Sequence, residues 1–196
     1  GQMRLAFTCE SKAGHTSAPP PRTAVDALCR AVVRVAEHPS PARLTPAAAA
    51  LFDTLGRHSS FSLRLVFANL WCFWPLLALI CRKAGGELNA LVRTTRSFTM
   101  LQGSAAFNVF PAKARMDADV RILSGESMAE ATERLRRVIG DGAIQIERVS
   151  GCEPSPISPA AGPAWERVST AIAGIWPGAV VTPYLMVARS DSSNFC

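Results

Sequence analysis

Apolar and polar residues alternate along several stretches of the chain, and this period of two predicts β-strands. Apolar side chains at every second position of residues 3–9 predict a half-buried strand. Residues 113–122 alternate most clearly, with small or apolar residues facing one way and Lys, Arg or Asp the other. The threonine-rich residues 93–102 predict another strand, and residues 144–149 predict the last one.

Two stretches carry the 3.6-residue period of amphipathic helices. In residues 23–37 one face collects Val25, Leu28, Cys29, Val32 and Ala36. Ser127 and Glu130 form a capping box for a second helix, whose expected buried stripe is Met128, Ala131, Leu135, Val138 and Ile139. The order of strands and helices predicts an α+β fold, a ferredoxin-like split βαβ sandwich whose antiparallel sheet carries its helices on one face.

A helical insertion, about residues 45–91, separates the first helix from the second strand. It begins with a helical piece at 46–55 and contains an uncharged run at 65–81, bounded by Arg64 and Arg82. The run is shorter than the roughly 20 residues of a membrane span and contains Pro75. We therefore expect no membrane span, but two short helices broken near Pro75 and covered by another domain or a second copy of the chain.

The composition changes after Ser150. Residues 153–159 form a proline-rich linker, which is followed by an amphipathic helix and a short strand around residues 180–185. One helix and one strand cannot form a domain alone. We expect residues 1–150 to be one domain and residues 151–196 to be a fragment of an α/β domain whose sheet lies elsewhere, in a chain excised from a longer protein.

Charge and cysteine content narrow the class of protein. The net charge of +6 is scattered, with no run of Lys and Arg, which argues against nucleic-acid binding. The six cysteines show neither CxxC pairing nor metal-ligand spacing, and most lie in apolar surroundings, as buried free thiols do. Together with the lack of a visible signal peptide, this favours a cytoplasmic location.

The candidate chemistry lies in loops that follow strands. His15, in the segment Gly-His-Thr-Ser-Ala-Pro-Pro at 14–20, lies at the mouth of the fold, whereas His38 and His58 have surface settings. Asp191 occupies a Ser-Asp-Ser turn, either a ligand loop or an Asx turn. No HExxH, GxSxG or Walker motif occurs. The residues alone predict a binding or assembly domain with hydrogen-bond donors at His15 and Asn108.

Three ordered motifs carry a resemblance to a known family: residues 14–20, Asn-Ala-Leu-Val-Arg-Thr-Thr at 89–95, and Phe-Asn-Val-Phe-Pro at 107–111. They resemble the di-zinc metallopeptidases of the aminoacylase, carboxypeptidase S and succinyl-diaminopimelate desuccinylase family. The insertion around Asn-Leu-Trp at 69–71 looks most like the branch of carboxypeptidase S and the N-acyl-amino-acid hydrolases. In that family the ferredoxin-like part is a lid and dimerisation domain inserted into a zinc-binding catalytic domain.

The resemblance implies roles for individual residues. His15 would donate a hydrogen bond to the tetrahedral oxyanion, often in the partner subunit's active site, and Asn108 would help to hold the substrate. Arg93 would pair with a substrate carboxylate, or is a surface residue at a strand edge. Residues 187–195 resemble the family's Thr-Asp-Ser-Arg turn around Asp191, with changes at Ala188, Arg189, Ser190 and Ser193.

The metal ligands and the general-base glutamate of the family lie outside the matched motifs. The resemblance therefore implies two zinc ions in the parent protein, none bound by this chain, and no hydrolysis by the chain alone. The parent would be a homodimer that cleaves an amide next to a free carboxylate in N-acyl amino acids or small peptides. The alternatives are a stand-alone ferredoxin-like interaction module and a membrane-associated module that uses residues 65–81.

Overall fold

The computed structural model describes residues 1–188. The chain forms two compact units, each made of two separate segments. The first unit comprises Gly1–Pro41 and Thr94–Pro154, and the second comprises Ala42–Arg93 and the chain from Ser155 onward.

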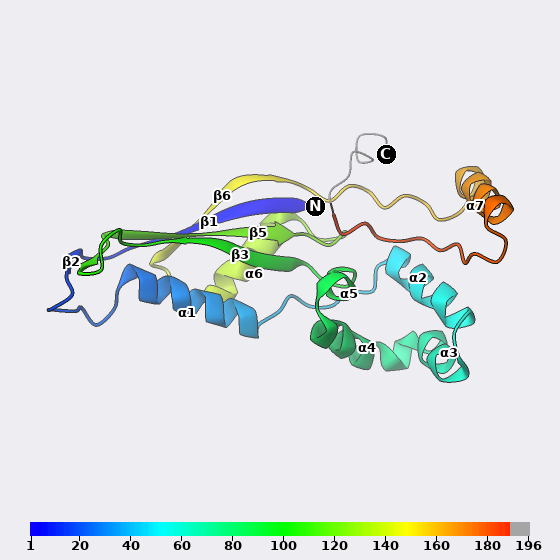
Figure 1. Ribbon diagram of the computed structural model, residues 1–196, viewed down its shortest axis with the longest axis horizontal. Coiled ribbons are helices and arrows are strands. Elements are labelled where there is room, and N and C mark those ends of the chain that lie inside the picture. The colour runs from blue at the N-terminus through cyan, green and yellow to red at the C-terminus, as the bar shows by residue number, and fades with distance from the viewer. Residues whose placement is uncertain (189–196) are drawn as a thin grey trace. The chain divides into compact units, whose positions relative to one another are not determined.

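A four-stranded antiparallel sheet is the centre of the first unit (Figure 1). Its strands lie in the order β3 (Thr95–Gln102), β5 (Lys113–Arg121), β1 (Gln2–Glu10) and β6 (Ile144–Cys152). Strand β1 pairs with both β5 and β6, so that Phe7 lies opposite Met116 on one side and Ile146 on the other. This strand order, with a helix after β1 and another after β5, confirms the predicted ferredoxin-like α+β fold.

Helices α1 (Ala24–Glu37) and α6 (Met128–Ile139) cover one face of this sheet (Figure 1). Both begin with a capping box, built by Thr23 with Asp26 and by Ser127 with Glu130. The predicted stripe of α6 is confirmed at its centre, where Ala131, Leu135 and Ile139 are buried. The face predicted for α1 is rotated: its buried residues are Ala24, Ala27, Leu28, Ala31 and Val35, and Cys29 is exposed.

The small residues of α1 explain this rotation. Alanine has little side chain to hold the helix away from the sheet, so Ala24, Ala27 and Ala31 can face Phe7 and Leu5 closely. Larger residues such as Val25 and Val32 then lie at the margins of the contact, where they are partly buried. A hydrophobicity pattern that ranks valine above alanine therefore points to the wrong side of this helix.

The second unit contains the helical insertion. Its helices are α2 (Pro46–Arg57), α3 (Phe61–Ala68), α4 (Leu70–Ala84) and α5 (Gly86–Ala90). Their shared core consists of Ala48, Leu51, Phe52, Leu77, Cys81, Leu91 and Val92. The rings of Phe52 and Phe67 stack with their centroids 5.6 Å apart, which joins α2 to α3.

The predicted break near Pro75 is wrong, because the chain turns at Asn69 instead. Asn69 has φ −121° and ψ 43°, and its side-chain amide donates to the carbonyl of Leu65 at 2.8 Å. This local bond offers the backbone an alternative to continued helix. Pro75 lies inside α4, where its missing N–H leaves one backbone hydrogen bond unmade, and the helix continues to Ala84.

The segment after the linker forms α7 (Pro163–Ile175) and then runs without regular structure to residue 188. The strand predicted around residues 180–185 is not formed. A strand needs a neighbour for its backbone hydrogen bonds, and no paired neighbour for this segment occurs within residues 1–188. Leu185 and Val187 nevertheless pack against the core of the insertion.

Candidate functional site

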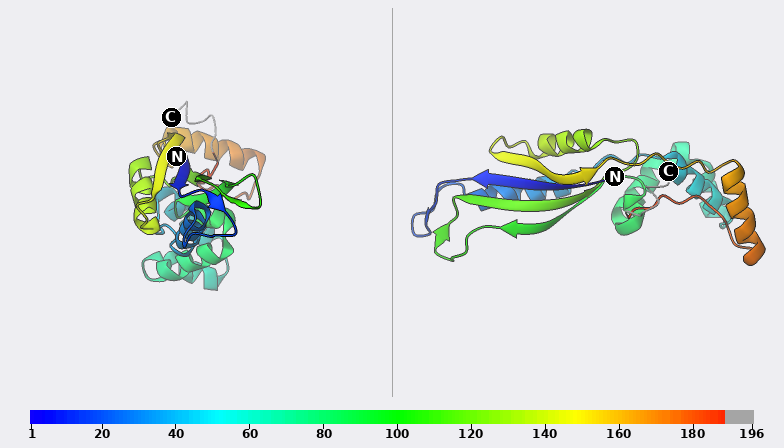
Figure 2. Two further views of the ribbon diagram at one scale, coloured as in Figure 1. Left: turned by 90° about the vertical axis from the view of Figure 1, so that its left-hand side faces the viewer. Right: turned by 90° about the horizontal axis from the view of Figure 1, so that it is seen from above.

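A short two-stranded ribbon positions His15. Strand β2 (Gly14–His15) pairs antiparallel with β4 (Val109–Phe110), with His15 opposite Val109. The ribbon follows directly on the β1–β5 pair, because the Ser11 amide donates to the carbonyl of Ala112 at 2.9 Å. It lies at one end of the sheet, as the view from above in Figure 2 shows. The loop predicted to lie at the mouth of the fold is thus an extension of the two central strands.

A tight turn after β2 holds the imidazole of His15. The amide of Ala18 donates to the carbonyl of His15 at 3.1 Å, which closes the turn. Within it, the amide of Ser17 donates to Nδ1 of His15 at 3.3 Å, and the Ser17 hydroxyl lies 2.9 Å from the same atom. An imidazole nitrogen that accepts an N–H carries no proton, so the proton of the neutral ring lies on Nε2.

Asn108 lies beside this imidazole. Its backbone carbonyl accepts from the Thr16 amide at 3.0 Å, which fixes the residue against the turn. Its Nδ2 lies 3.4 Å from Nε2 of His15. Both atoms carry N–H donors when the ring proton lies on Nε2, so they do not bond each other. The two residues proposed from separate motifs are therefore neighbours, and both can donate to a ligand oxygen.

This pair can bind an anion or a polarised carbonyl oxygen, because an imidazole N–H and a carboxamide N–H both donate to oxygen. His15, Ser17 and Asn108 are all exposed in this chain. No group of three or more His, Cys, Asp or Glu side chains suited to a metal ion occurs within residues 1–188. The site thus supplies hydrogen-bond donors and lacks the ligands of a metal centre.

Arg93 lies in the second unit and is buried, with 6% of its surface exposed. Its Nη2 donates to the carbonyl of Ala78 at 2.9 Å. Burial lowers the pKa of the guanidinium, and the nearby charge of Arg82 lowers it further. The interpretation of Arg93 as a surface residue at a strand edge is therefore wrong, while its pairing with a substrate carboxylate stays a prediction. Asp191 lies outside the described residues.

The sequence did not predict two residues: one that contacts the imidazole of His15 and one that stabilises the first unit. Ser17 contacts the imidazole through both its amide and its hydroxyl, and the only signal was a serine two residues after a histidine in a turn. Glu126 is buried in the first unit, where it accepts from the Thr94 hydroxyl and pairs with Arg134. No periodic pattern marks such a residue, because it lies in the loop before a helix.

Comparison with known proteins agrees with this architecture. Residues 1–147 match a protein family described as the peptidase dimerisation domain of the M20 peptidases. The chain is 30% identical to the probable carboxypeptidase S-like 2 of Dictyostelium discoideum, over all of this chain and 37% of that protein. It is 27% identical to the human N-fatty-acyl-amino acid synthase/hydrolase PM20D1, over all of this chain and 39% of that protein. The chain therefore spans well under half the length of these relatives.

Solved structures show the same fold. An M20 family metallo-carboxypeptidase from Sulfolobus solfataricus superimposes with a TM-score of 0.59 at 10% identity, over all of this chain and 54% of that one. The aminopeptidase PepT from Bacillus cereus gives 0.53 at 13% identity, over 98% of this chain and 39% of that one. Because the family match covers most of the sequence, the chain belongs to the M20 peptidase dimerisation domain family.

Proposed function

We propose that this chain is the lid and dimerisation part of a longer zinc-dependent hydrolase, which cleaves an amide bond next to a free carboxylate. The membership in the M20 dimerisation family supports a hydrolase as the parent. Relatives that match along the whole chain are named as carboxypeptidase S-like proteins and as N-fatty-acyl-amino acid synthase/hydrolases. N-acyl amino acids are therefore the substrate class that we favour, with small peptides as the second.

The observation that carries this proposal is the closeness of His15 and Asn108 at the tip of the β2–β4 ribbon. Amide hydrolysis passes through a tetrahedral intermediate whose oxygen becomes negative. A fixed N–H donor lowers the energy of that oxygen more than the energy of the ground-state carbonyl. The Nε2 proton of His15 would supply this donor, and the Asn108 carboxamide would hold the acyl or carboxylate part of the substrate.

The exposure of both side chains indicates that the site is incomplete in one chain. A hydrogen bond to a developing charge is weak in water and strong where water is excluded. The tip of the ribbon must therefore be covered by another protein surface before it can stabilise an oxyanion. A catalytic domain, in the same subunit or in the partner of a homodimer, would provide this cover.

The zinc ions would be bound by the same catalytic domain that covers the tip of the ribbon. The M20 metallopeptidases depend on metal, and residues 1–188 contain no set of side chains that could hold a zinc pair. Residues 1–188 do not fit a metal centre, so the zinc ligands and the activated water would belong to the rest of the parent. This chain would contribute substrate and oxyanion contacts and would hydrolyse nothing by itself.

The experiment is an assay of the full-length parent on N-acyl amino acids of different acyl length and on dipeptides. We expect hydrolysis that is lost after chelation and restored by zinc, and poor turnover of matched substrates whose carboxylate is an amide. Hydrolysis that survives chelation would show that the parent does not depend on zinc. A complete lack of hydrolysis on the whole panel would favour the alternative, a ferredoxin-like interaction module without enzymatic activity.

A further inference from the structure

The outer face of the helical insertion is apolar. On α4 the side opposite the buried residues carries Leu76 and Leu79, with Trp71 and Ile80 at its two margins, and these four are 50%, 45%, 85% and 49% exposed. On α3 Phe61 and Leu65, 80% and 50% exposed, lie on one side, and Leu63, 49% exposed, lies on the other. Consecutive helices thus expose more large apolar side chains than the scattered single ones of an ordinary surface.

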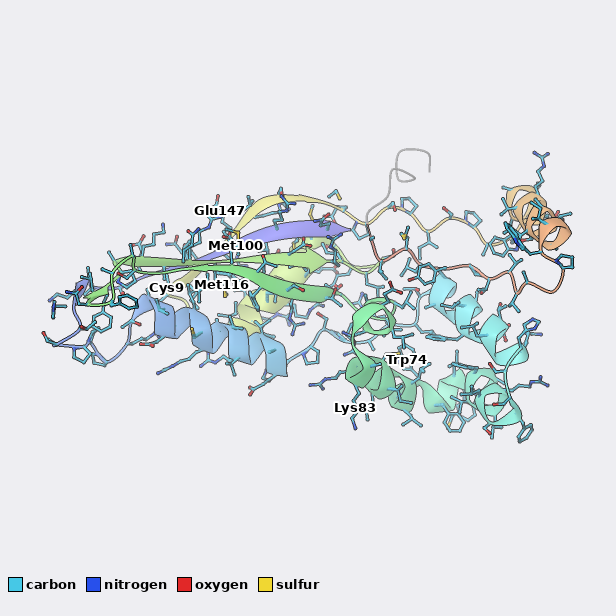
Figure 3. The ribbon with its side chains drawn as sticks, in the orientation of Figure 1. Cys9, Trp74, Lys83, Met100, Met116 and Glu147 are labelled. Atoms are coloured by element: carbon cyan, nitrogen blue, oxygen red, sulfur yellow. The ribbon has the colours of Figure 1, made fainter. Side chains whose placement is uncertain are left out.

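One side of α4 packs against the core of the insertion, and the other side is exposed. Leu77 and Cys81 are buried in the core of the insertion, and Trp74 packs against the same core. Lys83 follows Trp74 by nine residues, which places it on the opposite side of the helix, where Figure 3 also shows it. The outer face therefore lies opposite the side of α4 that faces the core, and it carries Lys83 between its apolar residues.

Positive charge surrounds this outer face. The sequence contains no Asp or Glu from residue 54 to residue 86, whereas Arg57, Arg64, Arg82 and Lys83 lie within this stretch; of these, Arg57 is paired with Asp53 on its own helix. All four side chains are exposed, and Arg82 and Lys83 lie in the last turn of α4. Apolar and aromatic residues bordered by arginine and lysine are typical of helices that lie in the interface of a membrane with anionic lipids.

We propose that α3 and α4 dock the parent protein on the surface of an anionic membrane. Trp71, Phe61 and the leucines would enter the boundary between headgroups and acyl chains, while Arg82 and Lys83 contact lipid phosphates. No single helix within residues 1–188 is long and apolar enough to span a bilayer. Helices α3 and α4 would pass that test only together, and they are bent by 109° at Asn69, which suits helices that lie along a surface.

The charge pattern favours a membrane over the other surfaces that could cover this face. A second copy of the chain would bring the same positive residues together, which costs free energy. A protein core would seldom bury Arg64, Arg82 and Lys83 beside apolar side chains without acidic partners. An anionic bilayer satisfies both features at once, because its interior takes the apolar side chains and its phosphates take the cations.

Vesicle co-sedimentation of the full-length parent tests this proposal without any measurement of turnover, so it is independent of the proposed hydrolase function. We expect binding to phosphatidylcholine vesicles that contain phosphatidylglycerol, weaker binding to pure phosphatidylcholine, and a decrease with added salt. The variant Trp71→Ser/Leu79→Ser should lose at least about tenfold in affinity. The control Val33→Ser, which alters a residue 54% exposed on α1, should bind like the wild type.

The variant Arg82→Gln/Lys83→Gln gives a second test that leaves the apolar face intact. We expect it to lose about tenfold or more on anionic vesicles and to show less dependence on salt. Circular dichroism should report unchanged folding for both variants. A wild-type parent that does not bind, or a parent whose α3–α4 variants bind as well as the wild type, would overturn the proposal; the outer face would then be covered by the rest of the parent or by a protein.

Discussion

Nε2 of His15 lies 3.4 Å from Nδ2 of Asn108, although 93 residues separate them in the sequence. The register of the β2–β4 ribbon produces this contact, because it places His15 opposite Val109, the residue after Asn108. The Asn108 carbonyl also accepts from the Thr16 amide. The backbone therefore holds both candidate side chains at one place before any ligand arrives.

The proton of the neutral His15 ring should lie on Nε2. The Ser17 amide donates to Nδ1 at 3.3 Å and thereby selects this tautomer. Long-range proton–nitrogen correlation spectra should show Nε2 as the protonated nitrogen at alkaline pH. In Ser17→Ala the amide remains, so the same tautomer should persist. Protonation of Nδ1 in either protein would remove His15 as an Nε2–H donor.

Glu126 should be important for the stability of the first unit. Its side chain, 4% exposed, accepts from the Thr94 hydroxyl and pairs with Arg134, while Thr94 in turn accepts from the Leu123 amide at 3.0 Å. Removal of the carboxylate in Glu126→Ala should lower the free energy of unfolding by about 2 to 3 kcal/mol, because it leaves buried partners unpaired.

Urea unfolding followed by circular dichroism measures this change. The matched control is Glu133→Ala, which removes an exposed ion pair with Arg136 on the same helix. Its effect should stay below about 0.5 kcal/mol, because exposed ion pairs contribute little. Equal effects of the two substitutions would show that the buried network has no special role.

Gly56 should not tolerate a side chain. A Cβ atom there would lie 2.6 Å from Cβ of Phe67, where α2 and α3 are in contact. Gly56→Ala should therefore destabilise the protein by about 1 to 3 kcal/mol, since the helices must move apart. Gly142→Ala is the control, because nothing lies within 4 Å of its new Cβ. Thermal unfolding compares the two, and equal midpoints would contradict the close packing of α2 and α3.

The thiols should differ in reactivity. Cys29 and Cys72 are exposed, whereas Cys9 and Cys81 are buried, and burial raises the pKa of both buried thiols. Because the thiolate is the nucleophile, iodoacetamide should modify Cys29 and Cys72 at least about tenfold faster than the buried pair. Mass spectrometry of a labelling time course measures these rates. Fast labelling of Cys81 in folded protein would contradict the packing of α4.

Strand β5 could be predicted because it records its environment in alternating residues. Ala114, Met116, Ala118 and Val120 are buried on β5, and the charged residues between them are not. Helix faces were predicted less well where alanine makes the contact, as on α1. Hydropathy cannot distinguish an alanine that permits close packing from one that is exposed, because its side chain is small in either case.

The remaining differences arise from interactions that no short pattern reports. Pro75 was expected to break the insertion, but the side chain of Asn69 bonds the carbonyl of Leu65 and ends α3 first. Residues 180–185 have the composition of a strand and lack a paired strand within residues 1–188. The contact of His15 with Asn108 depends on the register of two strands, which becomes visible only once the chain is folded.

Steady-state kinetics of the parent with His15→Ala is the measurement that tests the proposed hydrogen bond from His15 to the oxyanion. The control is His58→Ala, which alters an exposed histidine at the end of α2. We predict that kcat of His15→Ala falls about a hundredfold or more with unchanged zinc content and little change in KM, while His58→Ala retains full activity. A His15→Ala enzyme within about twofold of the wild type would contradict the account, since loss of an oxyanion donor costs far more than that.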